Sequence, residues 1–129
     1  MGNKEKGSKA ERELYDMFVS NNYRAVRIAG SGMMEETACD LIAGKKGGRK
    51  YSIEVKASKA PYKYITKEQI EQLMIFSEIF GLQPLIAVRF NREGWFFLSP
   101  KELRDSGKHW VITLEEARVK GERFGQFFS

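Results

Sequence analysis

Cysteine and histidine are almost absent from the sequence, which holds one of each, Cys39 and His109, in 129 residues. The single cysteine excludes an internal disulfide framework, and with one histidine it also excludes the Cys/His zinc sites of small zinc-binding domains. No apolar run approaches the ~20 residues of a membrane-spanning helix. The stretch 1–13 is polar, so we expect no secretory signal, and Lys6 stands where an N-myristoylation motif needs Ser or Thr. We therefore expect a soluble, cytoplasmic protein without a membrane partner.

The residues that are plentiful are apolar or basic. The hydrophobic set makes up 42% of the chain and includes nine Phe, five Tyr and two Trp, which favours a packed core over disorder. The net charge is +5 and the sequence pI is near 9.4, which indicates a polyanionic partner. The length suits one domain, 1–129. Within it we expect residues 1–7 to be loose, and we leave the structure of the aromatic tail, 121–129, open.

Helix starts are marked by capping boxes, in which Ser or Thr is followed three residues later by Glu or Gln. Such pairs predict helices that begin at Ser8, Thr66, Ser99 and Thr113. The first helix, 8–22, carries apolar residues at helical spacing, as a helix packed on a core does. Gly81 is expected to end the second helix and Gly107 the short third one.

The segments between these helices have the composition of strands. We expect strands at 24–29, 39–43, 50–57, 84–90, 94–98 and 109–113, with loops at 30–37 and 58–65. The glycines between 39–43 and 50–57 are typical of a hairpin. The order of helices and strands predicts an α/β fold, with a mixed central β-sheet flanked by helices.

One carboxylate stands alone in a basic stretch. Residues 41–67 contain eight Lys or Arg and a single acid, Glu54, which shares a strand face with Lys56. If 39–43 and 50–57 pair as a hairpin, Asp40 and Glu54 converge. Two carboxylates and a lysine suit metal-assisted hydrolysis of a phosphodiester, because Mg²⁺ prefers hard oxygen ligands. The alternative is a solvated strand face with a weak ion pair, and a turn role for Asp40.

A resemblance to a known family rests on blocks that occur in order along 4–98: residues 6–14 (KGSKAEREL), 27–32 (RIAGSG), 40–43 (DLIA), 54–56 (EVK) and 84–90 (PLIAVRF). In these blocks the chain resembles the archaeal-type Holliday junction resolvases of the PD-(D/E)xK nuclease superfamily. The resemblance implies a restriction-endonuclease-like core and an endonuclease that cuts four-way junctions symmetrically. It also implies an Mg²⁺ cofactor, for which Mn²⁺ substitutes, and a nucleoid-associated protein. Cys39 departs from the superfamily, which has Pro there.

The resemblance assigns four catalytic residues: Glu11, Asp40, Glu54 and Lys56. Asp40 and Glu54 would bind the metal together with the Val55 carbonyl, and Glu11 would support the metal or its water. Lys56 would orient or activate the nucleophile. Two other functions stay open: a nuclease of the same superfamily that cuts duplex or flap DNA, and a non-catalytic basic DNA-binding module.

Contacts to DNA are expected from basic, small flexible and aromatic side chains, namely Lys6, Lys9, Arg12, Arg27, Gly30, Ser31, Lys59, Tyr64 and Gln72. Lysine-rich turns that only aid solubility, a plain Gly-Ser-Gly turn and core packing of the tyrosine are the alternatives.

The second helix is apolar on more than one side. We expect one side, with Ile70, Leu73 and Met74, to cover the sheet, and the other to pair with a second subunit in a homodimer. The residues of that expected interface are Ile75, Phe76 and Ile79. Burial of this side under 99–113 is the alternative.

Overall fold

The computed structural model describes residues 2–28 and 39–128, with side chains from Ser8 onward. Within these residues, five strands form a central sheet in the order β1-β2-β3-β5-β6, and a smaller sheet has the order β4-β8-β7. The central strands are β1 Arg24–Arg27, β2 Leu41–Gly44, β3 Lys50–Ser58, β5 Gln83–Phe90 and β6 Gly94–Leu98. The smaller sheet comprises β4 Tyr62–Thr66, β7 Arg104–Asp105 and β8 His109–Thr113. The helices are α1 Gly2–Ser20, α2 Lys67–Phe80, the 3₁₀ turn η2 Pro100–Glu102, α3 Leu114–Lys120 and α4 Phe124–Phe127.

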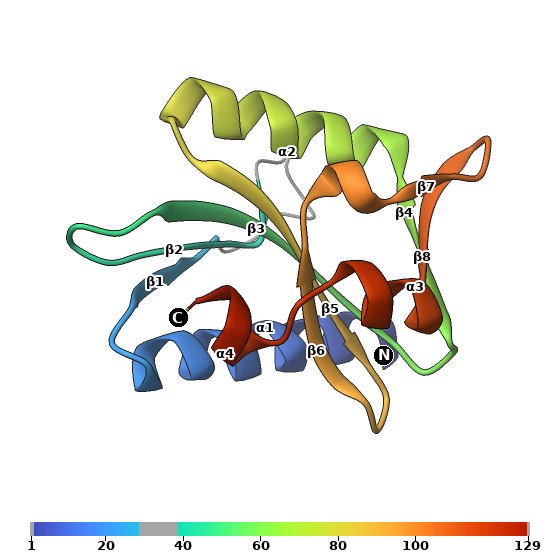
Figure 1. Cartoon of the computed structure of the whole chain (residues 1–129), viewed down its shortest axis with the longest axis horizontal. Helices are drawn as coiled ribbons and strands as arrows, with labels where there is room; N and C mark the ends of the chain where they lie inside the picture. The colour runs from blue at the N-terminus through green and yellow to red at the C-terminus, as the bar shows by residue number, and fades with distance from the viewer. Residues whose placement is uncertain (1, 29–38, 129) are drawn as a thin grey trace.

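The central sheet is mixed and lies between two helices. β3 and β5 run parallel, whereas β1–β2, β2–β3 and β5–β6 pair antiparallel. Figure 1 shows α1 and α2 on opposite sides of this sheet. The predicted α/β fold with a mixed central sheet flanked by helices is confirmed. No helix in the described part of the chain is long and apolar enough to cross a membrane.

The alternation of side chains along β3 and β5 divides the core in two. In β5, Leu85 and Ala87 join a cluster with residues of α1, and Ile86 and Val88 join a second cluster with residues of α2. A strand buried on both faces reads as a continuous apolar run, as 84–90 does. In β3 the side chain of Ser52 meets that of Ser77 in α2. Every second residue of β3 after Ser52 therefore lies on the α2 face of the sheet.

The capping box at Thr66 marks the start of a helix, but the one at Ser8 does not. Thr66 caps α2 and Gly81 ends it with a left-handed φ of 66°, as predicted. α1, however, begins at Gly2 instead of Ser8, so residues 2–7 extend the predicted helix, and their flexibility stays a prediction. The Ser8 hydroxyl accepts a hydrogen bond from Arg27 instead of capping. α1 ends at Ser20 because Asn22 takes a left-handed φ of 67°.

Three further expectations change. The predicted loop 58–65 contains most of β4, which pairs antiparallel with β8 and buries Ile65. The third predicted helix is only the turn η2, followed by the short β7. Met74, grouped with the sheet-facing residues of α2, is exposed, and Ser77 is buried in line with Ile70 and Leu73.

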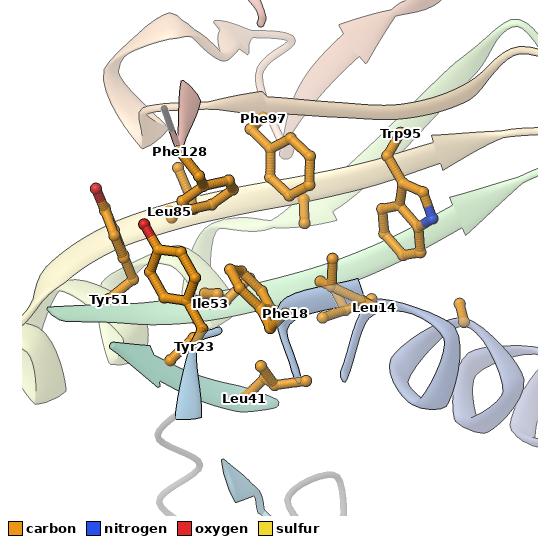
Figure 2. Packing of buried hydrophobic residues seen from close by; sticks show 14 residues of the cluster. Leu14, Phe18, Tyr23, Leu41, Tyr51, Ile53, Leu85, Trp95, Phe97 and Phe128 are labelled. Carbon is orange, nitrogen blue, oxygen red and sulfur yellow. The ribbon is translucent and has the colours of Figure 1, made fainter. Parts of the chain in front are cut away.

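The aromatic tail, whose structure the sequence left open, completes the core on the α1 side. Phe128, which follows α4, is buried and packs edge-on against four rings from α1, the following turn, β3 and β6. Figure 2 shows these rings, Phe18, Tyr23, Tyr51 and Phe97, gathered around it. The C-terminal residues thus hold α1 against the strands that carry the functional site.

We expect Phe128→Ala to lower the free energy of unfolding by about 3 kcal/mol, because it leaves a cavity among the rings. Urea denaturation of the two proteins measures the difference. The control is Val119→Ala on α3, where the side chain is exposed and the change should stay within about 0.5 kcal/mol. Equal effects of the two substitutions would show that the tail does not contribute to the core.

Candidate active site

The candidate site forms where β2 separates from β3. The last residue of β2 to pair is Leu41, opposite Ile53, and the Asp40 N–H then donates to the Ile53 carbonyl at 3.0 Å. One residue pair further along β3, none of the strands in residues 2–28 and 39–128 takes β2's place. Instead, the Val55 N–H donates to the Asp40 carboxylate oxygen Oδ2 at 2.8 Å. Asp40 is therefore held by its backbone and by its side chain at the open edge of β3.

The same hydrogen bond orients the Val55 carbonyl. In a β-strand the N–H and C=O of one residue point to the same edge, and successive residues alternate between edges. Since the Val55 N–H points toward Asp40, its carbonyl is directed to the same open edge, and Val55 lines the cleft there. A backbone oxygen thus joins the carboxylate of Asp40.

Glu54 is the buried carboxyl of the site. Its exposed fraction is 7%, it is hydrogen-bonded to Asp40, and its Oε2 lies 3.4 Å from the Lys56 Nζ. Burial, and then the negative charge of Asp40, raise the pKa of Glu54 to about 8, while Lys56 acts in the opposite direction. At neutral pH the Glu54 carboxyl therefore keeps a proton, which a bound cation would replace.

Glu11 approaches from α1. Its Oε1 lies 3.3 Å from the Arg27 Nη2, which also donates to the Ser8 hydroxyl at 3.2 Å. Burial and the charge of Asp40 raise the pKa of Glu11, whereas Arg27 lowers it. In the described part of the chain the buried Nε of Arg27 has no hydrogen-bond partner. Glu13, two residues on, turns away from this cleft and pairs with Arg89.

These groups line one cleft of about 490 Å³. Its lining residues are Glu11, Asp40, Glu54, Val55, Lys56, Ala57, Ser58, Lys59, Ala60, Lys63 and Gln69. Within residues 2–28 and 39–128, no three His, Cys, Asp or Glu side chains form a ready-made metal cluster. The donor set is therefore two carboxylates and a carbonyl, which fits Mg²⁺, an ion that binds through one or two carboxylates and keeps several waters.

The residues predicted to contact DNA are spread more widely. Lys59 lines the cleft, and Lys9 lines a neighbouring one. Arg12 is exposed on α1, and its Nη1 lies 3.5 Å from the Ser8 hydroxyl. Arg27 adjoins the cleft through its ion pair with Glu11.

Two of these predicted contacts lie elsewhere. Tyr64 is exposed and packs against Tyr62 and His109 on the small sheet. Gln72, on α2, does not line the cleft. The Lys6 side chain, Gly30 and Ser31 lie outside the described residues.

The sequence analysis did not select five residues that line the cleft, namely Ala57, Ser58, Ala60, Lys63 and Gln69. Lys63 lies in the basic stretch that the sequence analysis described. Once 62–66 is recognised as a strand, Lys63 must face the side opposite to Tyr62 and Tyr64, and this alternation was the available signal. Gln69 was noted only as the partner in the Thr66 capping box, where its side chain accepts from the Thr66 N–H at 3.3 Å. Gln69 lines the cleft because it lies in the first turn of α2, whose N-terminus reaches the cleft.

Comparisons with known proteins agree on one family. The family model described as archaeal Holliday junction resolvase (Hjc) matches residues 2–124. A protein of Methanocaldococcus jannaschii named crossover junction endodeoxyribonuclease Hjc is 43% identical over 115 residues, which cover 89% of this chain and 79% of that protein. The Archaeoglobus fulgidus protein of the same name is 34% identical over 135 residues, covering 95% and 98%. The solved structure of Archaeoglobus fulgidus Hjc, a Holliday junction resolvase, superposes with a TM-score of 0.84 at 26% identity, covering 95% of this chain and 94% of that one.

Glu54 should make the stability of the metal-free protein depend on pH. The pKa of Glu54 is about 8 in the folded protein and 4.5 for an ordinary Glu. Between pH 4.5 and pH 8 the Glu54 side chain is therefore ionised in the unfolded chain but still protonated in the folded protein. The free energy of unfolding should therefore fall by roughly 4 kcal/mol as the pH rises from 4.5 to 8. Urea denaturation in EDTA measures this, and Glu54→Gln should remove most of the slope. The same slope in both proteins would refute this assignment.

Proposed function

The chain belongs to the archaeal Holliday junction resolvase family, and on this basis we propose that it is a structure-selective DNA endonuclease that resolves four-way junctions by paired, symmetric cuts. The observation that carries the proposal is the convergence of Asp40, Glu54 and Lys56 in one cleft at the open edge of β3. Two adjacent carboxyls next to an ammonium group suit a site that binds a cation and a phosphodiester.

The residues at the open edge would hold a divalent metal ion. Asp40 and Glu54 would bind it through carboxylate oxygens, and Val55 through its carbonyl. We propose Mg²⁺, with Mn²⁺ as a substitute, because the donors are hard oxygens. When bound, such an ion polarises the phosphate and lowers the pKa of a coordinated water.

The chain's own groups would position the reaction. Lys56, whose Nζ lies 3.4 Å from Glu54 Oε2, would hold the attacking water or offset the charge that develops on the phosphate. Glu11, kept in place by Arg27, would accept a hydrogen bond from a water at the metal. Glu11, Asp40, Glu54 and Lys56 are thus the catalytic residues that we propose.

Junction DNA would be held mainly by its phosphates. We propose contacts from Lys6, Lys9, Arg12, Arg27, Gly30, Ser31, Lys59, Tyr64 and Gln72, as the sequence analysis predicted. Contacts of this kind depend on salt and are nearly independent of base sequence, which suits an enzyme that recognises the shape of a junction.

A homodimer would place two such sites on one particle. On α2, Ile75, Ile79 and Phe80 are exposed, the last two by 71% and 64%, and the ring of Phe76 packs against Phe80. Ile75 and Ile79 are exposed, so the alternative of burial under 99–113 is wrong for these two residues, whereas Phe76 is partly buried against the second core cluster. An apolar helix face open to water favours a partner, and we propose a symmetric interface that includes Ile75, Phe76 and Ile79.

Asp40→Asn and Glu54→Gln should each reduce cutting of a four-way junction by roughly 10³-fold or more, because each removes a metal ligand. Junction binding should persist in both variants, and it should become tighter in Asp40→Asn, which removes a negative charge, whereas Glu54 is already protonated at neutral pH. Cleavage of labelled junctions with Mg²⁺ and binding in EDTA measure the two effects. Glu115→Gln, an exposed acid on α3, is the control for charge.

The same assay discriminates the other functions. Normal cutting by the Asp40→Asn and Glu54→Gln proteins would rule out the catalytic assignment. Equal cutting of four-way, flap and linear DNA at matched salt would refute resolvase activity but leave a nuclease. Binding without any cutting by the unaltered protein would indicate a non-catalytic DNA-binding module.

Ile79→Glu should convert the protein to a monomer, because it places a charge in an apolar interface. Analytical ultracentrifugation should then give a mass near 14.8 kDa instead of twice that value. Paired cuts within one junction should become independent single nicks. Val119→Glu, at an exposed position of α3, should behave like the unaltered protein. A monomeric unaltered protein would contradict the proposed dimer.

A further inference from the structure

A second cleft adjoins the candidate active site, near the end of β3. It has a volume of about 250 Å³. Its lining residues are Lys9, Ala10, Glu13, Ala57, Ser58, Lys59, Arg89 and Asn91. Ala57, Ser58 and Lys59 line both clefts, so the two adjoin at the last residues of β3 and the turn that follows.

A three-residue network fixes one wall of this second cleft. The Glu13 Oε1 accepts hydrogen bonds from the Arg89 Nε at 3.0 Å and from the Trp95 Nε1 at 2.7 Å. Trp95 is buried, and Figure 2 shows it at one end of the core cluster with its indole nitrogen directed away from the other labelled rings. Glu13 therefore satisfies a core indole and holds the arginine with the same oxygen.

This arrangement leaves the outer edge of the guanidinium available. In the part of the chain that the structure describes, Arg89 bonds only through Nε, and its side chain is partly exposed. Its two terminal amino groups then form a planar pair of donors that matches two oxygens of a phosphate. An arginine fixed at one end loses little conformational entropy when such a ligand binds.

The charges around the cleft favour an anion. Lys9, Lys59 and Arg89 line it, against one acid, Glu13. Lys9 and Lys59 are exposed, and neither takes part in an ion pair with the residues that the structure describes. A bound phosphate would neutralise part of this excess.

We propose that this second cleft binds a backbone phosphate of the cut DNA strand, next to the scissile phosphate, with Arg89 as its principal ligand and Glu13 as a positioning residue. The inference rests on the proposed function. In the β3–β5 pairing, Arg89 lies opposite Ala57, which is the residue that follows Lys56 in the chain. At roughly 3.3 Å per residue along a strand, the two clefts follow one another closely enough for successive phosphates of one DNA strand.

The first experiment measures four-way junction binding in EDTA, where no cutting occurs, over a series of salt concentrations. Arg89→Gln should weaken binding roughly five- to tenfold at low salt and reduce the slope of log K against log salt by about one. Arg89→Lys, which keeps the charge without the paired donors, should be intermediate. Lys101→Gln, an equal charge change on η2 outside both clefts, is the control. If Arg89→Gln binds like Lys101→Gln, the proposal is wrong.

The second experiment identifies the phosphate. Single methylphosphonate linkages, which are neutral, replace each phosphate within three nucleotides of the cut. One position next to the cut should weaken binding by the unaltered protein at least fivefold and leave Arg89→Gln unaffected. Equal losses for both proteins at every position would overturn the proposal. If Arg89→Gln does not fold, as judged by thermal unfolding, Arg89→Lys replaces it, and the methylphosphonate should then weaken its binding less than that of the unaltered protein.

Glu13→Gln tests the positioning role. The amide oxygen can still accept from Trp95, but the ion pair with Arg89 is lost. If Glu13 positions Arg89, the sensitivity to the methylphosphonate should fall although the protein has become more positive. Tighter binding with the sensitivity unchanged would limit Glu13 to a structural role. If the unaltered protein does not bind the junction, the proposed function itself is wrong. If it cuts normally but the effect of the methylphosphonate does not depend on Arg89, only the proposal for the second cleft is wrong.

Discussion

The hydrogen bond from the Val55 N–H to the Asp40 carboxylate is the contact on which the site depends. It exists because β2 leaves β3 after Ile53, so a backbone donor that would otherwise pair with a strand pairs with a side chain. Where the Asp40 side chain replaces a strand as the partner of the Val55 N–H, the edge of β3 is open. Asp40 then lies beside Glu54, and the Val55 carbonyl is directed into the cleft. The raised pKa of Glu54 follows from the same geometry, because burial and the charge of Asp40 both oppose its ionisation.

The two clefts share a common construction. Two glutamates of α1, two residues apart, point to different sides, and each pairs with an arginine from the central sheet: Glu11 with Arg27 of β1, and Glu13 with Arg89 of β5. In both pairs the acid orients a cation at the edge of a cleft. α1 therefore connects the candidate catalytic groups to the basic surface, and the aromatic packing of Phe128 against Phe18 holds that helix in place.

Much of the fold and the centre of the site follow from local patterns. The capping boxes at Thr66 and Thr113 begin helices as expected, because a cap needs only the residues of one turn. The predicted hairpin brings Asp40 to Glu54, since two adjacent strands joined by a short turn meet whatever surrounds them. β4 was missed because its strand character depends on pairing with β8, which is distant in the sequence. The Ser8 cap was wrong because α1 already begins at Gly2, so Ser8 lies inside the helix.

The sequence by itself determined the class of fold, the basic character of the surface and the ordered residues Asp40, Glu54 and Lys56, because short-range periodicity and motif spacing carry that information. Only the tertiary structure decided how strongly Glu54 holds its proton and where the aromatic tail packs. The physical reason is the same in each case. Burial and charge at a given atom depend on groups from several elements, and their arrangement exists only once the sheet and its covering helices have assembled.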